Sequence, residues 1–478
     1  MDRPDAIVIG AGLGGLGAAV ALTRLGARVQ VFEALTYPGG CAATFVKDGY
    51  RFDAGATVAW GLDPGRLLHT WLTEAQVPLD VCFLDPALEL RTPQWRVAVP
   101  SRRGPAIEAL GRLPGVDPAA VSAYLTWQGA LADDLWPLFD DPDRLPWPAV
   151  RTWPWHAARA HRWARVVPWL GRPLAAALAR FGLDGGPFHT FVDAACQITV
   201  QCSAAEAEAP FAASAIDALF RAPAHVVGGI GRLSDALVEV IRRGGGEVRF
   251  ADRVRDVRRT DAGWSVSARS GEYTADTVIA NVLPATLTTW DDGRWADPAL
   301  DRAVQTGWGA VMRYLAVRSP PGAPAEAHHL QLVADPTAPL LAGNHAFVSI
   351  AGEDEAHAGA RAVTMSTHVS LGGDVAAAVT AAQARLDDTL RALAPEWTDA
   401  DWARTASPRT FTRFVRRPGG FVGGVPRRAG LGAYARMGPT EVAPGLLLVG
   451  DSTFPGQGTL PAAVGGARAA ARVRIPRP

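Results

Sequence analysis

The chain begins with apolar and polar positions arranged as a strand, a helix and a second strand. Residues 6–9 form a short apolar run, which suits a buried parallel strand. Residues 29–32 are again apolar and predict a second strand that finishes at Glu33. Between them, a helix ending at Gly26 is predicted by apolar side chains at helical spacing, namely Leu16, Ala19, Val20, Leu22 and Leu25.

Related patterns return in two later parts of the chain. Residues 225–257 contain a glycine pair, an amphipathic helix and a strand, and residues 275–287 predict a further strand. Near the end, the apolar run 446–449 predicts a buried strand, and the alanine-rich segment 462–473 predicts a helix. The apolar face of the helix within 225–257 consists of Leu233, Leu237, Val240 and Ile241.

Another pattern fills the stretch between these parts. Residues 327–370 alternate apolar runs with polar turns, which is consistent with an antiparallel sheet. Residues 374–397 form a clear amphipathic helix. We therefore expect two kinds of structural unit in one chain.

Composition agrees with a large globular protein. A length of 478 residues exceeds the usual size of a single core, so two intertwined lobes are expected. Lys plus Arg and Asp plus Glu balance at 47 each, so no overall field attracts nucleic acid. The four cysteines show neither CxxC nor zinc spacing, which suggests a reducing cytoplasm without disulfides.

Two observations bear on membranes. Only MDRPD precedes the first strand, so no signal peptide is expected. No apolar stretch approaches the roughly 18–20 residues of a spanning helix. The sequence predicts a cytoplasmic protein that is soluble or lies on a membrane surface.

The turn after the first strand carries a dinucleotide motif. Gly10, Gly12 and Gly15 satisfy G-x-G-x-x-G, with glycines for the tight turn, the approach of pyrophosphate and the packing of helix on strand. Glu33 follows 18 residues after Gly15, where an acid accepts hydrogen bonds from an adenosine ribose. An acid there favours a free 2′-hydroxyl, which excludes NADP but leaves NAD and FAD open.

The following residues favour FAD. Pro38, Gly39 and Gly40 form a second loop whose bare backbone can approach a ligand, where a simple dehydrogenase would continue with a helix. Residues 52–55 end in a further glycine and extend this pattern of bare backbone. A second loop beside the pyrophosphate suits a long, extended FAD better than a transient NAD.

A family resemblance joins these motifs. Residues 10–57, GAGLGGLGAAVALTRLGARVQVFEALTYPGGCAATFVKDGYRFDAGAT, resemble the FAD-containing amine oxidase and phytoene desaturase superfamily, and are most similar to its carotenoid desaturase and isomerase branch. Residues 407–426, SPRTFTRFVRRPGGFVGGVP, resemble a stretch leading back to the flavin in carotenoid isomerases and C-3′,4′ desaturases. The resemblance implies an α/β fold: a Rossmann-like FAD-binding domain of the amine oxidase type, and an α+β substrate domain containing a mixed or antiparallel sheet.

The resemblance also implies the lobes and the cofactor site. The FAD-binding domain is expected to be discontinuous, at 1–90, 220–285 and 425–478, with 91–219 and 286–424 forming the substrate domain. Many relatives carry Arg after the glycine pair, and this chain has Cys41, so no cation is expected from that position. The predicted cofactor-binding residues are Gly10, Gly12, Leu13, Gly14, Gly15, Glu33, Ala34, Gly39, Gly40, Cys41, Ala56, Thr57, Val254, Asn281, Gly450, Asp451, Gly458, Thr459 and Leu460.

Two of these positions have a specific implied role. In the superfamily, backbone groups at the position of Val254 cradle adenine, and the residue matching Asp451 lies against the ribityl chain and pyrophosphate. After the loop 454–459, the free N–H groups of the last helix would stabilise negative charge developing at flavin N1/O2.

The sequence names neither a catalytic residue nor a metal site. No Ser/His/Asp set stands out, and a structural role is expected for His225, His345 and His368. His328 and His329 should point to opposite faces of a strand. The lack of an obvious acid–base set is compatible with a flavin enzyme, because the cofactor performs the difficult chemical step.

The leading hypothesis is an FAD-dependent carotenoid desaturase, with C-3′,4′ desaturation preferred on resemblance. Desaturation then consists of hydride loss to flavin N5 and proton loss from the adjacent carbon, with oxygen or a quinone as the final electron acceptor. A carotenoid cis/trans isomerase that uses reduced FAD is the alternative. An amine oxidase-like flavoenzyme and a non-enzymatic carrier of prenylated proteins remain further alternatives on this fold.

Residues 127–181 have an unusual composition. They hold 7 of the 16 tryptophans together with several arginines, and such a segment can sit at a lipid interface. Packing of the substrate lobe explains the tryptophans equally well, because Pro154, Pro168 and Pro173 interrupt helix periodicity. Contact of this segment with the inner face of the cell membrane is therefore one of two expectations.

Overall fold

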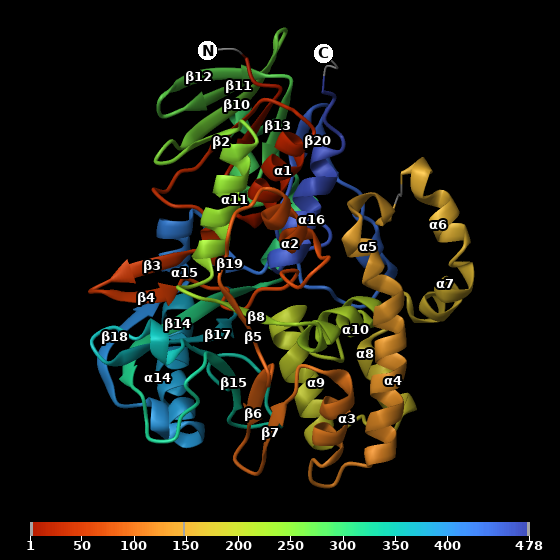
Figure 1. Cartoon of the computed structure of the whole chain (residues 1–478), viewed down its shortest axis with the longest axis vertical. Helices are drawn as coiled ribbons and strands as arrows, with labels where there is room; N and C mark the ends of the chain where they lie inside the picture. Colours follow the sequence, from red (N-terminus) through yellow and green to blue (C-terminus); the bar gives the residue numbers. More distant parts are fainter. Residues whose placement is uncertain (1–2, 147–148, 476–478) are drawn as a thin grey trace.

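The computed structural model describes residues 3–146 and 149–475. Figure 1 shows one sheet with its helices at the end of the molecule where both termini lie, and a second sheet beside a group of helices at the other end. The strands are β1 Ala6–Ile9, β2 Val29–Phe32, β3 Thr44–Lys47, β4 Tyr50–Asp53, β5 Val81–Phe83, β6 Leu88–Arg91, β7 Arg96–Val99, β8 Ala224–Val226, β9 Glu247–Arg249, β10 Val254–Thr260, β11 Gly263–Ala268, β12 Gly271–Ala275, β13 Thr277–Ala280, β14 Trp308–Arg318, β15 His328–Val333, β16 His345–Ile350, β17 Ala360–Val369, β18 Ala400–Ala406, β19 Phe421–Val422, β20 Thr440–Ala443 and β21 Leu446–Leu448. The helices are α1 Leu13–Arg24, α2 Leu67–Glu74, α3 Arg103–Gly111, α4 Pro118–Leu135, α5 Pro137–Asp140, α6 Trp153–Ala157, α7 Ala160–Val166, α8 Leu174–Arg180, α9 Gly186–Thr199, α10 Ala209–Asp217, α11 Gly231–Arg243, α12 Pro284–Leu287, α13 Pro298–Gln305, α14 Val375–Leu393, α15 Pro408–Thr410 and α16 Thr459–Ala470.

The first sheet gathers the strands predicted at both ends of the chain. Its order is β20-β21-β13-β1-β2-β9, and all of its pairs are parallel except the edge pair of β20 with β21. β1, β2 and β13 are buried along their whole length, since helices cover one face of this sheet and the β10–β12 sheet covers the other. The predicted Rossmann-like α/β class is therefore confirmed.

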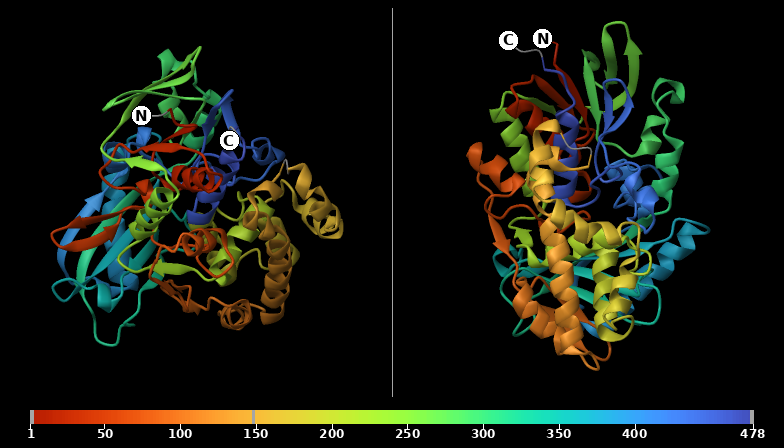
Figure 2. Two further views of the ribbon diagram at one scale, coloured as in Figure 1. Left: turned by 45° about the horizontal axis from the view of Figure 1, so that its top comes forward. Right: turned by 90° about the vertical axis from the view of Figure 1, so that its right-hand side faces the viewer.

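The first and last helices of the chain pack against each other (Figure 2). Their backbones approach so closely that a Cβ on Gly466 of α16 would lie 2.0 Å from the Gly14 carbonyl oxygen, and one on Gly17 would lie 2.4 Å from that of Ala463. Glycine is required at both positions for this approach. The C-terminal helix thereby lies beside the N-terminal glycine turn.

The second sheet is mixed, as expected. Its order is β18-β14-β17-β16-β15-β6-β7, with β19 also paired to β14. Neighbours are antiparallel except β15 and β6, and α14 packs on this sheet. In β15, His328 is half-buried whereas His329 is fully buried, as alternation along a strand predicts.

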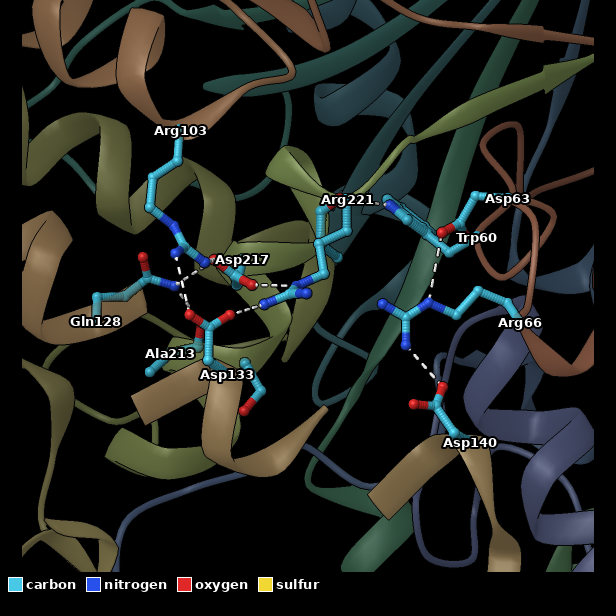
Figure 3. A network of polar contacts seen from close by, with 12 residues as sticks. Trp60, Asp63, Arg66, Arg103, Gln128, Asp133, Asp140, Ala213, Asp217 and Arg221 are labelled. Carbon is cyan, nitrogen blue, oxygen red and sulfur yellow. Dashed lines mark hydrogen bonds and ion pairs between the residues drawn. The ribbon is translucent and has the colours of Figure 1, made fainter. Parts of the chain in front are cut away.

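Helices α3, α4 and α10 stand beside the second sheet and are joined by charged side chains around the buried Asp217 (Figure 3). Asp217, at the end of α10, is fully buried and accepts from Arg103 Nη2 and Arg221 Nε, both at 2.6 Å. Asp133 of α4 pairs with the same two arginines. These pairs hold α4 against α10, and the two helices form part of the wall of the cavity described below.

Asp53, at the end of β4, makes the stability of the folded protein depend on pH. Its Oδ1 accepts from Thr44 Oγ1 at 2.7 Å and from the Ile230 amide at 2.9 Å, but burial raises its pKa to about 6. Because the folded pKa exceeds the ordinary 3.8, this group favours the folded state most below pH 4, and that contribution falls as pH rises through 6.

We expect Asp53→Asn to stabilise the fold more at pH 8 than at pH 4, by about 3 kcal/mol, which is the free-energy equivalent of the pKa shift from 3.8 to about 6. The asparagine carbonyl retains both accepted hydrogen bonds. Urea unfolding at a series of pH values measures the difference. Exposed Asp388, changed to Asn, is the control, and equal effects of Asp53→Asn at all pH values would contradict the assignment.

Candidate functional site

One long cavity of 1430 Å³ runs through the molecule from the first sheet to the second. Its walls come from the glycine turn before α1, the loops after β2 and β4, the start of α16, the floor strands β14, β16 and β17, and helices α4, α7 and α10. A typical single-ligand site measures about 300–1,000 Å³. The cavity is large enough for a dinucleotide and a second molecule beside it.

The glycine turn and Glu33 form one end of the cavity. Glu33 is 8% exposed, and its carboxylate accepts from the backbone amides of Ala11 at 2.7 Å and Leu35 at 2.8 Å. Burial raises the pKa of this carboxyl, against the effect of these amide bonds. The two bonds fix the carboxylate while leaving oxygen lone pairs for hydroxyl donors of a ligand.

Asn281 fixes the glycine turn from behind. Its side chain lies within 2.5 Å of a Cβ built on Gly12 and within 2.8 Å of one built on Gly14. Its Nδ2 also donates to the Gly10 carbonyl oxygen at 3.5 Å. Asn281 follows β13, which explains how the turn after β1 is held against the neighbouring strand of the sheet.

The structure brings the predicted cofactor residues to this one cavity. With the exception of Gly15, every residue of the predicted set lines it. Gly15 lies behind the turn, where a Cβ would come within 2.0 Å of the Gly10 carbonyl oxygen. Its absence of a side chain therefore serves the packing of helix on strand.

A cation that the sequence prediction missed lies beside Cys41. Arg417 Nη2 donates to Asp451 Oδ2 at 2.8 Å, and Arg417 also hydrogen-bonds to the Cys41 thiol. The two charged side chains are 14% and 22% exposed, so this is a largely buried ion pair in the cavity wall. Although Cys41 itself brings no charge, the segment 407–426 places a guanidinium next to it. The one available signal was the basic run Arg416-Arg417 in that segment, but its partner lies 34 residues away.

The start of α16 faces the same cavity. Gly458 is its N-cap residue, and the Thr459 hydroxyl oxygen accepts from the Trp60 amide at 2.9 Å. The N–H groups of the first turn of a helix have no partners within the helix and carry partial positive charge. This end of α16 therefore favours negative charge on a bound group.

Thr57, which lines the cavity, is the end of a polar relay that runs behind the cavity wall. The Ser349 hydroxyl donates to Thr57 Oγ1 at 2.6 Å, and His329 Nδ1 lies 2.7 Å from Ser349 Oγ. Burial lowers the pKa of His329 well below its usual range, so its ring is neutral. Phe347 stacks on this ring, at a centroid distance of 5.6 Å, and itself lines the cavity.

Comparison with known proteins supports the family predicted from the sequence. Residues 8–75 match the family model described as NAD(P)-binding Rossmann-like domain. Over 98% of its length the chain is 27% identical to prolycopene isomerase of Arabidopsis thaliana, of which it spans 82%. Over 62% of its length it is 24% identical to the neurosporene-forming phytoene desaturase of Rhodobacter capsulatus, of which it spans 57%. The chain is a relative of the carotenoid desaturases and isomerases.

The fold agrees with this relationship. The structure of a putrescine oxidase variant, A394C, superposes with a TM-score of 0.65 and covers 98% of both chains at 16% identity. At that identity the likeness concerns the fold alone. The fold of this chain is therefore of the amine oxidase type, as predicted from the sequence.

For a relative of these enzymes, the far part of the cavity has a suitable lining. Aromatic and aliphatic side chains dominate it, including Trp136, Phe139, Trp163, Val166, Phe211 and Tyr434. Arg66 and Arg221 lie over the ring of Trp136, at 5.6 and 5.3 Å from its centroid. The network in Figure 3 therefore also holds an aromatic side chain of the cavity wall in place.

Most of the described tryptophans of the segment 127–181 pack into the protein. Trp169 is buried, and Trp127, Trp136, Trp155 and Trp163 are half-buried against the core. Trp153 is 61% exposed, whereas Trp147 lies outside the described residues. Packing therefore explains most of the cluster, and contact of this segment with a membrane stays a prediction.

Three further observations concern the residues within 3–146 and 149–475. In these ranges no group of three or more His, Cys, Asp and Glu residues gathers as a metal site. Cys41, Cys82, Cys196 and Cys202 are free thiols. No helix in the described ranges is both long and apolar enough to cross a membrane.

Proposed function

We propose that this chain is an FAD-dependent oxidoreductase acting on a carotenoid or similar polyene, with C-3′,4′ desaturation as the preferred reaction. One observation carries the proposal: a single cavity joins the dinucleotide cradle to a channel lined by aromatic and aliphatic side chains. An apolar chain that enters from the α4–α7 side meets the cofactor end without leaving the protein. The relatives named above act on carotenoids by their names, which supports the choice of polyene.

The residues present fit FAD. Gly12 and Gly14 line the cavity with backbone that a pyrophosphate can approach, and Glu33 offers acceptors for ribose hydroxyls. Asp451 and the first turn of α16 would face the ribityl chain and the flavin ring. FAD, when bound there, supplies a two-electron acceptor for a hydride.

The remaining work falls to the chain itself. The wall of Trp136, Phe211 and Tyr434 binds an apolar substrate and excludes water from the reacting bond. The floor formed by Met312 and Phe347 limits how deeply the substrate can enter. Thr57 is hydrogen-bonded to Ser349, which in turn contacts His329. The Thr57 hydroxyl is the group of this relay that lines the cavity, and it can form a hydrogen bond with a bound molecule there.

The direct test has two parts. The purified protein should be yellow and should release FAD on denaturation. Anaerobic incubation with a panel of carotenes and an added quinone as electron acceptor, followed by chromatography and mass spectrometry, should then give a product lighter by two hydrogens. A colourless protein would remove the cofactor assignment and revive a non-enzymatic carrier of prenylated partners. A flavoprotein that turns over an amine but no carotene would instead favour the amine oxidase-like alternative.

A carotenoid isomerase is the second candidate. Similarity to prolycopene isomerase extends over 98% of this chain, which is the longest alignment among the relatives described above. A parallel incubation with the flavin reduced beforehand separates the two reactions, because isomerisation changes the retention time and leaves the mass unchanged. The isomerase would require prior reduction of the flavin, and the desaturase an added oxidant such as oxygen or a quinone.

The cavity also suggests how a lipid-borne substrate enters. α6 and α7 project from the side of the molecule (Figure 1), and Val150, Trp153 and Val167 around them are 79%, 61% and 60% exposed. Arg151 and Arg165 flank them with side chains 64% and 54% exposed. We infer that this face lies on an anionic membrane, such as the inner face of the cell membrane, beside the cavity entrance lined by Trp163 and Val166.

Trp153→Gln with Val167→Gln is expected to reduce co-sedimentation with anionic vesicles at least tenfold, because two apolar side chains no longer enter the interface. Val46→Gln on β3, which removes a side chain of 65% exposure elsewhere on the surface, is the matched control. Equal co-sedimentation of both variants and the wild type with anionic vesicles would contradict this proposal.

A further inference from the structure

Two arginines pack against the ring of Phe454, which lies in the loop before α16. The guanidinium carbons of Arg427 and Arg468 are 5.8 and 5.5 Å from the centroid of this ring. Each guanidinium donates to backbone carbonyl oxygens, that of Arg427 to Pro455 at 2.9 Å and that of Arg468 to two carbonyls at 2.7 Å each. The two differ in one respect: Arg427 lines the cavity, whereas Arg468 is 5% exposed and does not.

Arg427 carries a positive charge that no carboxylate of the described residues balances. In the part of the chain that the structure describes, its guanidinium has only the carbonyl oxygens of Thr453 and Pro455 as hydrogen-bond partners. The next residue, Arg428, by contrast pairs with Glu206. Burial lowers the pKa of Arg427 to about 10, so the group stays charged at neutral pH. A cation that faces the cavity without a counter-ion favours an anion within it.

The surroundings of Arg427 hold this charge in one place. Its amide donates to the Val200 carbonyl oxygen at 3.2 Å, and its own carbonyl oxygen accepts from the Glu208 amide at 2.9 Å. The guanidinium also lies over the ring of Phe211, at 5.4 Å from the centroid. A Cβ built on Gly456 would come within 2.7 Å of Arg427 Nη2, so the loop needs a glycine there to admit the guanidinium. The position of the charge is therefore fixed in advance.

Two sources of positive potential meet at this point of the cavity wall. Gly458, the N-cap residue of α16, follows Pro455 by three residues, and the free N–H groups of the first turn carry partial positive charge. The carboxyls that line the cavity belong to Glu33, at the glycine turn, and to Asp451, which is paired with Arg417. Fixed positive groups in a site that excludes water stabilise negative charge that develops beside them.

We propose, on the basis of the FAD assigned in the proposed function, that Arg427 stabilises the negative charge that the cofactor gains on reduction. When the C–H bond of the substrate breaks with both of its electrons, the substrate is oxidised and FAD is reduced, and FAD gains one negative charge with the hydride. The guanidinium makes this transfer more favourable, and no proton has to be delivered into an apolar cavity to neutralise the charge. Arg427 thereby joins the cofactor site from outside the predicted set.

Sulfite tests this charge without turnover, because it adds as an anion to the flavin ring and leaves a negative charge on it. The flavin-loaded wild type should bind sulfite, and its reduced flavin should stay anionic below the pH at which free reduced FAD takes up a proton. Arg427→Met should weaken sulfite binding at least tenfold and lower the two-electron midpoint potential by at least about 30 mV, the equivalent of tenfold. Arg427→Lys keeps the charge and should retain most of both properties.

Arg468→Met is the matched control. It removes the other arginine from Phe454 together with its bonds to backbone carbonyls, but it removes no charge that faces the cavity. We expect its sulfite affinity and midpoint potential to equal those of the wild type. Flavin content and thermal melting are measured on every variant, so that a disturbed loop is distinguished from a lost charge.

Unchanged sulfite affinity and potential in Arg427→Met would overturn the inference. Equal losses in both methionine variants would also overturn it, because the loop and not the charge would then be responsible. Should Arg427→Met lose its flavin, the wild type and Arg427→Lys decide: sulfite binding and an anionic reduced flavin in both support the inference, and their absence from the wild type overturns it. A colourless wild type would refute the cofactor assignment on which both proposals rest. A flavoprotein that binds sulfite but turns over no polyene would refute the proposed substrate alone.

Discussion

A valine in place of Gly466 is expected to remove bound flavin and to cost at least about 3 kcal/mol of stability, since overpacking a tight contact is destabilising. The new side chain would meet the backbone of α1, where even a Cβ lies 2.0 Å from the Gly14 carbonyl oxygen and 2.6 Å from the Ala18 nitrogen. Backbone atoms within a helix cannot rotate away as a side chain can. The two helices must separate instead.

Their separation would act directly on the cofactor site. Leu13 at the start of α1 and Thr459 at the start of α16 both line the cavity, so a shift of one helix moves one wall against the other. Urea unfolding and released flavin per polypeptide measure the two effects.

Gly104 provides the control for this prediction. It lies in α3, and a Cβ built there meets nothing within 4 Å, so Gly104→Val should change stability by no more than about 0.5 kcal/mol. A Gly466→Val protein with normal stability and flavin content would show that the contact between α1 and α16 does not hold the site together.

Asp451→Ala is expected to lower flavin retention and to destabilise the protein by about 3 kcal/mol. Breaking a buried pair from one side leaves the other charge uncompensated. Arg417, at 14% side-chain exposure, would lose its carboxylate partner and retain the Phe421 carbonyl oxygen and the Cys41 thiol. Flavin content and the unfolding midpoint are again the measurements.

A double variant separates the structural role from the cofactor role. Arg417→Met with Asp451→Leu removes both charges, so stability should recover toward that of the wild type while flavin retention stays low. The control is Asp388→Ala, which breaks an exposed pair with Arg391 and should change neither property. Full flavin content in Asp451→Ala would show that the assignment of Asp451 to the cofactor is mistaken.

The local part of the cofactor site could be predicted from the sequence. Residues 6–33 form β1, the glycine turn, α1 and β2 in the predicted order, with Glu33 at the end of β2. Such predictions succeed because a strand, a tight turn and a helix fix the relative positions of residues close in the chain. The predicted strand 446–449 likewise appears as β21, parallel to β13 of the same sheet.

The substrate end of the cavity could not be predicted in this way. Thr57 and Ser349 bond to each other across 292 residues, and His368, expected to be structural, lines the cavity. Such neighbours are set by the packing and register of the second sheet, and the local pattern around each residue carries no record of them. The same holds for Arg417, whose charge was visible in the sequence but whose partner was not.

The sequence by itself determined that this chain carries a Rossmann-like unit with a glycine turn and an acid at the correct spacing, because those features depend on contacts between near neighbours. Only the tertiary structure decided that the last helix closes against the first, that Arg417 meets Asp451 beside Cys41, and that Arg427 lies in the cavity wall beside the loop into α16. These arrangements depend on which distant segments pack together. The energy of that packing is shared among many side chains along the whole chain.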